Sequence, residues 1–105
     1  MPENLMTDEE LDAEYREMID IFIDKANELA KQSNIENISM ALLHAASRFN
    51  AYVVSNHAET LNDYENELDK ARTFFISNYN AMLDENLQDY KKKYNEEFKY
   101  LHLMN

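Results

Sequence analysis

The residues with the clearest potential for chemistry are His44, Arg48 and Asn50, which stand in a run of alanines, leucines and aromatic residues. Four positions separate His44 from Arg48, so a helix would place the two side chains one turn apart on the same face. An imidazole beside a guanidinium is suited to acid–base chemistry or to holding an anion. These three residues form the candidate ligand or partner site.

A structural role is the simpler alternative for the same residues. A guanidinium in an apolar helix needs a partner, because an unpaired buried charge is costly. Arg48 would then bridge carboxylates on a neighbouring helix, and Asn50 would hydrogen-bond a backbone group. His44 would be an ordinary solvated side chain. The sequence leaves open whether Arg48 is structural or instead grips an anionic group of a ligand or partner.

Other chemistry has little support in the sequence. The chain has no cysteine, so it offers no thiolate nucleophile, disulfide or sulfur ligand, and it has no glycine for a tight catalytic loop. Its histidines lack the Glu-x-x-His and His-x-x-x-His spacings of di-iron and helical zinc sites. We therefore expect no metal, no cofactor and no assignable catalytic residue. This favours a non-enzymatic role without settling the question of catalysis.

The charge of the chain limits its partners. Its 21 acidic residues outnumber 10 lysines and arginines, which gives a net charge of −11. An acidic surface repels phosphate backbones and anionic headgroups, so we expect neither a nucleic-acid nor a membrane partner. The basic cluster 91–93 is explained by a helix C-terminus. With an acidic start and no long apolar run, the sequence predicts a cytoplasmic protein.

Apolar residues recur at steps of three and four through most of the chain, which predicts helices over about 8–32, from about 38 to 57, and over 60–100. We therefore predict an all-α, three-helix up-down-up bundle with a long C-terminal helix, forming one domain over 1–105. Residues 1–7 are expected to be a flexible N-terminus and 91–105 a possible C-terminal extension. The expected buried core comprises Phe22, Leu42, Ala45, Phe49, Leu68 and Phe75.

Two surpluses of apolar residues predict an interface. The second helix carries a further apolar strip roughly opposite its main stripe. If the neighbouring helices cover the main stripe alone, this second strip is left without a partner. The third helix, about 60 Å long against about 37 Å for the first, carries aromatic residues beyond the reach of its partners. The candidate interface residues are Met40, Leu43, Val54, Tyr90, Tyr94 and Phe98.

The segments 39–52 and 79–90 together resemble a family of small acidic bacterial proteins that is defined only as a domain of unknown function. The most specific part is Ala-Ala-x-Arg-Phe-Asn-Ala, which stands here at 45–51. The resemblance covers roughly residues 11–90. It implies a short, helical, bacterial cytoplasmic protein and assigns no catalytic residues.

We expect the function to be protein–protein association, beginning with a homodimer or extending to another protein. One alternative is a small-ligand-binding protein or an enzyme that uses the face carrying His44 and Arg48. Another is an acidic decoy that occupies the basic surface of a nucleic-acid-binding protein by charge mimicry.

Overall fold

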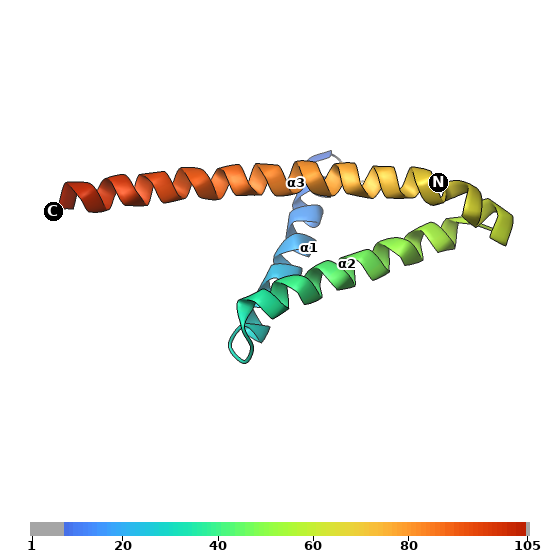
Figure 1. The fold of residues 1–105 in the computed structure, drawn as a ribbon, viewed down its shortest axis with the longest axis horizontal. Helices are drawn as coiled ribbons and strands as arrows, with labels where there is room; N and C mark the ends of the chain where they lie inside the picture. Colours follow the sequence, from blue (N-terminus) through green and yellow to red (C-terminus); the bar gives the residue numbers. More distant parts are fainter. Residues whose placement is uncertain (1–7, 105) are drawn as a thin grey trace. The chain divides into compact units, whose positions relative to one another are not determined.

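The computed structural model describes the backbone of residues 8–104 and the side chains of residues 9–94. Within this range the chain forms three helices, α1 (Asp8–Leu29), α2 (Ile35–His57) and α3 (Leu61–Met104), and no strand (Figure 1). The predicted all-α fold with three helices and a long C-terminal helix is confirmed. Residues 1–7, expected to be a flexible terminus, lie outside the described range.

Side-chain caps define where α2 and α3 begin. The Asn34 side-chain oxygen accepts a hydrogen bond of 2.8 Å from the backbone N–H of Asn37, and the Thr60 hydroxyl accepts one of 3.1 Å from Asp63. Both are N-cap bonds, which satisfy an amide that has no partner within the helix. The cap at Asn34 starts α2 a few residues earlier than its apolar periodicity predicts, so residues 35–37 are helical and do not belong to the loop.

The end of α1 is reached without glycine. The N–H of Gln32 and of Ser33 both donate to the carbonyl of Leu29, at 3.0 and 3.1 Å. These bonds tighten the last turn and satisfy a terminal carbonyl. Because no described residue has a positive φ, this turn needs no left-handed residue.

Helix α3 is one uninterrupted element of 44 residues, whereas α1 has 22 and α2 has 23. At about 1.5 Å per residue it is about 66 Å long, roughly twice the length of either of the others. The segment predicted as a possible extension is therefore a direct continuation of this helix as far as Met104. The lysines at 91–93 thus lie inside the helix and not at its C-terminus, so the explanation expected for this basic cluster is wrong.

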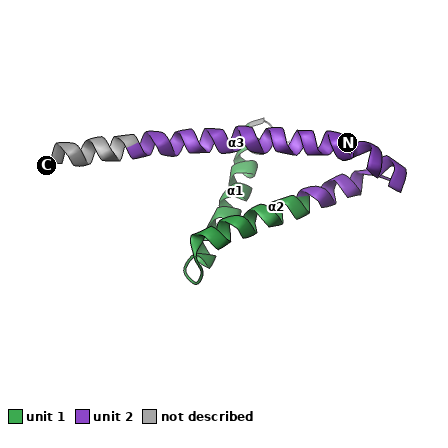
Figure 2. Ribbon diagram, viewed as in Figure 1, with its two compact units in different colours: residues 1–49 green, residues 50–105 purple. Residues whose placement is uncertain are grey.

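The chain forms two compact units (Figure 2). Unit 1, Met1–Phe49, contains α1 and the first part of α2, and unit 2, Asn50–Asn105, contains the end of α2 and α3. The sequence predicts a single domain. That prediction requires the two units to unfold together, and it stays a prediction.

The expected buried core is wrong. No side chain among residues 9–94 is buried; Phe22 and Phe49 are 62% and 64% exposed, while Leu68 and Phe75 are half-buried. The physical reason is that each unit contains two helical segments, and two helices shield only the faces that they turn toward each other. The half-buried side chains are Ala26, Ala30 and Ile38 in unit 1, and Asn50, Val53, Val54, Ala58, Tyr64, Leu68, Ala71 and Phe75 in unit 2.

Candidate functional site

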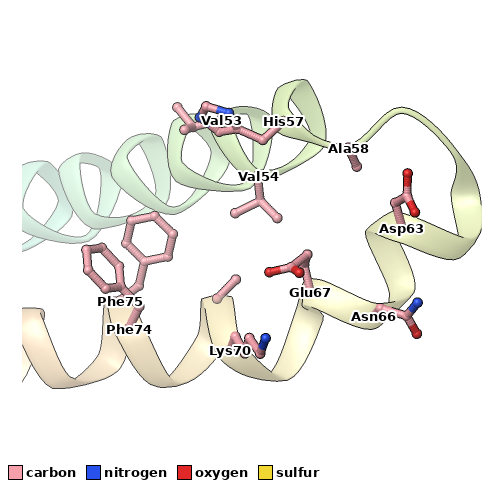
Figure 3. Close-up of a pocket in the computed structure, with 11 residues that line it drawn as sticks. Val53, Val54, His57, Ala58, Asp63, Asn66, Glu67, Lys70, Phe74 and Phe75 are labelled. Carbon is pink, nitrogen blue, oxygen red and sulfur yellow. The ribbon is translucent and has the colours of Figure 1, made fainter.

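Unit 2 contains a cavity of about 680 Å³ between the end of α2 and the first turns of α3 (Figure 3). The short connection of residues 58–60 brings these two helix ends together. The lining residues are Val53, Val54, His57, Ala58, Asp63, Asn66, Glu67, Lys70, Ala71, Phe74 and Phe75.

Six of the eleven side chains that line the cavity are apolar. Val54 projects from α2 toward α3, and the ring of Phe75 rises from α3 toward α2 (Figure 3). Ala58 and Ala71 contribute only methyl groups, so they leave space that larger side chains at these positions would fill. The cavity thus follows from small residues placed beside large ones on facing helices.

An aromatic pair closes one end of the cavity. The rings of Phe74 and Phe75 have centroids 5.3 Å apart and planes at 83°, which is an edge-to-face contact. Phe75 is half-buried, whereas Phe74 is 61% exposed. The pair therefore extends the apolar lining from the interior to the surface.

Polar side chains surround this apolar interior. Asp63, Glu67 and Lys70 come from α3 and His57 from α2, and Figure 3 shows the Glu67 carboxylate in the space between the two helices. No group of three potential ligands able to hold a metal ion occurs among the described residues. The lining contains no serine, threonine or cysteine that could act as a nucleophile. The six apolar lining side chains are suited to contact with an apolar group.

The residues proposed for chemistry lie outside this cavity. His44 and Arg48 are both exposed and share one face of α2, as their spacing predicts. Asn50 is half-buried and lies about 200° around the helix from Arg48, so it belongs to another face. The helix therefore places His44 and Arg48 on one face and Asn50 on another.

Of the two roles that the sequence leaves open for Arg48, the exposed side chain does not fit the buried ion pair. The ion pairs Lys25–Glu28 at 3.6 Å and Arg72–Asp69 at 3.1 Å do not include Arg48. Both pairs join residues three apart on the same helix. An exposed guanidinium is hydrated, so it needs no carboxylate from a neighbouring helix.

The candidate interface residues have different environments. Val54 is half-buried and lines the cavity, so it packs within unit 2. Met40 is 60% exposed and Leu43 is 38% exposed. Tyr90 and Tyr94 are exposed on α3. The side chain of Phe98 lies outside the described residues.

Sequence reasoning missed the cavity and four of its polar residues, His57, Asp63, Glu67 and Lys70. The signal in the sequence was a small residue near large apolar ones on each side of the break at about residue 60. Ala58 follows two valines, and Ala71 precedes two phenylalanines. This signal was incomplete, because it does not specify which face of each helix turns toward the other.

Over the residues that the structure describes, no helix has both the length and the apolarity to cross a bilayer.

No curated protein and no solved structure matches the chain. A family model described as "Protein of unknown function (DUF3144)" matches residues 15–91, close to the range of the expected resemblance. This match covers most of the chain, including the residues of the cavity and His44 and Arg48. The chain therefore belongs to this family of proteins of unknown function.

Proposed function

We propose that this protein is a protein–protein association module and that its first partner is a second copy of itself. The observation that carries the proposal is the absence of any buried side chain among residues 9–94, combined with large apolar side chains exposed on all three helices. Extended apolar surface is typical of proteins that bind other proteins.

The energetics favour association. Covering apolar surface stabilises a protein by about 25 cal/mol per Å², or about 1.5–3 kcal/mol for a large side chain that becomes fully buried. Tyr15, Phe22, Phe49 and Tyr90 each leave more than half of their area in contact with solvent. A partner that covers several such side chains would supply a gross apolar contribution that offsets the entropy cost of association.

The net charge of −11 limits which surfaces of two copies can come into contact. Two such chains repel each other, so a dimer must join apolar strips and keep its acidic faces in solvent. A two-fold arrangement does this most simply, because one strip meets its own copy. A bacterial, cytoplasmic setting is implied by the family resemblance and belongs to the same proposal.

Sedimentation equilibrium over a range from about 1 to 100 μM tests the proposal. We expect the mass to rise toward twice the 12.5 kDa of one chain, and the thermal midpoint to rise with protein concentration. A dimer stable at these concentrations should bury on the order of 1,200 Å² or more. A constant mass of 12.5 kDa, together with a midpoint independent of concentration, would contradict self-association.

A further inference from the structure

The second half of α3 carries an apolar strip that has an internal symmetry. We define the distal strip as Leu83, Leu87, Tyr90 and Tyr94, which are 40%, 58%, 69% and 68% exposed. Their spacings are four, three and four residues, so they lie on one face of the helix. This order of spacings is the same in both directions along the helix.

A palindromic strip can meet its own copy when the second helix runs in the opposite direction. A two-fold axis between positions 88 and 89 would pair Leu83 with Tyr94 of the partner subunit, and Leu87 with Tyr90 of the partner subunit. Every pair then combines a leucine with a tyrosine, which fills the space between the helices evenly. The amino-acid sequence continues the same symmetry outward, with Ile76 and Tyr79 on one side and Phe98 and Leu101 on the other.

The charges on the flanks of the strip do not share the symmetry of its apolar residues, because they differ in sign before and after its centre. Within residues 83–94, Asp84 and Glu85 precede its centre, whereas Asp89 and the three lysines at 91–93 follow it. At about 100° per residue, Asp84 and Lys91 lie on one flank of the strip, and Asn86 and Lys93 on the other. The Lys93 ammonium nitrogen lies 5.2 Å from the centroid of the Tyr90 ring, which keeps this charge beside the strip.

The direction of the second helix decides which flanks meet. In an antiparallel pair each flank meets its own copy, so Asp84 would lie within about 3 Å along the axis of Lys91 of the partner subunit. The two-fold axis forms this contact twice. In a parallel pair the opposite flanks meet, and Lys91 would instead face Lys93 of the partner subunit. Charge complementarity therefore favours the antiparallel pair.

We propose that the distal strip is a dimer seam in which α3 pairs with α3 of a second copy, antiparallel, about a two-fold axis between Gln88 and Asp89. This inference rests on the proposed self-association and specifies its surface, direction and register. The seam joins apolar faces and pairs unlike charges, which is what a chain of net charge −11 requires for self-association.

Charge reversal at Lys91 tests the direction of the pair. Lys91→Glu would place a carboxylate beside Asp84 of the partner subunit in both copies of this contact, so we expect the dimer to weaken by about tenfold relative to Lys92→Glu. Position 92 faces away from the strip, and its substitution makes the same change in net charge. The double variant Asp84→Lys with Lys91→Glu restores the pairing in the reverse order, so its affinity should return to within about threefold of wild type.

Spin labels test the register independently, because the chain has no cysteine and a single introduced cysteine gives one label per subunit. Ala81→Cys and Gln88→Cys place labels on the same outward face of α3. In the antiparallel seam the two labels of a dimer are separated along the axis by about 22 Å at position 81 and about 2 Å at position 88. Pulsed dipolar spectroscopy should therefore measure a clearly longer distance at 81.

The outcomes separate the two proposals. Equal distances at 81 and 88, or a tighter dimer for Lys91→Glu than for Lys92→Glu, would indicate a parallel pair and overturn the inference while leaving self-association intact. Equal affinities for these two charge variants would exclude the distal strip as the seam. A wild-type chain that stays monomeric would overturn both proposals.

Discussion

The two halves of α3 carry apolar stripes of similar spacing and have different surroundings. In the first half, Leu68, Ala71 and Phe75 are half-buried, and Ala71 and Phe75 line the cavity beside the end of α2. In the second half, Leu87 and Tyr90 are 58% and 69% exposed. Periodicity therefore predicts that a helix has an apolar face, but it contains no information about what covers that face.

The length of the elements explains the difference. A short connection brings the end of α2 beside the start of α3, so residues near this connection acquire a neighbour from the same chain. Helix α3 has 44 residues and α2 has 23, so α3 continues well beyond the length of the helix before it. The first stripe belongs to the fold of unit 2, and we assign the second to association.

The largest expected effect comes from breaking the distal half. Leu87→Asp would place a carboxylate in the centre of the proposed seam, so we expect the dimer dissociation constant to rise by at least about 100-fold, measured by sedimentation equilibrium. The control Gln88→Asp adds the same charge outside the strip and should change the constant by less than about threefold. Similar effects of both substitutions would contradict the assignment of the strip.

Breaking the proximal half should affect stability. Phe75 is half-buried beside the cavity, so Phe75→Ala should lower the free energy of unfolding by about 2 kcal/mol, less than the 3–5 kcal/mol typical of a fully buried phenylalanine. Leu61 belongs to the same stripe and is 72% exposed, so Leu61→Ala should cost less than about 1 kcal/mol. Urea titrations at one fixed protein concentration measure both; a larger loss for Leu61→Ala would refute the packing described for unit 2.

The cap at Thr60 offers a smaller test of the proximal half. Its hydroxyl accepts the N–H of Asp63 at 3.1 Å, so Thr60→Ala should destabilise the start of α3 by about 1 kcal/mol. Thr60→Ser keeps an accepting hydroxyl and should recover most of that loss. Amide hydrogen exchange should locate the change in the first turn of α3, with protection around the distal strip unaltered. Faster exchange at the strip would show that the two halves of α3 open together.

The smallest effect is expected at Arg48, which belongs to neither half. Its side chain is exposed, so Arg48→Met should change the free energy of unfolding by no more than about 0.5 kcal/mol. The same denaturant titration measures this change. A loss of more than about 2 kcal/mol would instead support the buried ion pair that the apolar sequence context suggests.

Much of the local structure follows from the sequence alone. Apolar steps of three and four residues predict all three helices. The start of α3 lies close to the predicted position, whereas the cap at Asn34 starts α2 a few residues earlier than the apolar steps predict. The spacing of His44 and Arg48 likewise predicts their shared face. Each of these features depends on residues within one or two turns of each other.

The surroundings of each face depended on the tertiary structure. Phe49 and Val54 belong to different strips of α2, and the structure half-buries Val54 beside α3 while Phe49 stays 64% exposed, the reverse of the expected assignment. The cavity was not predicted for the same reason. A helical pattern specifies the angle of each side chain around its own axis, whereas burial depends on the direction from which a second helix approaches, and that direction is set by contacts between residues distant in the sequence.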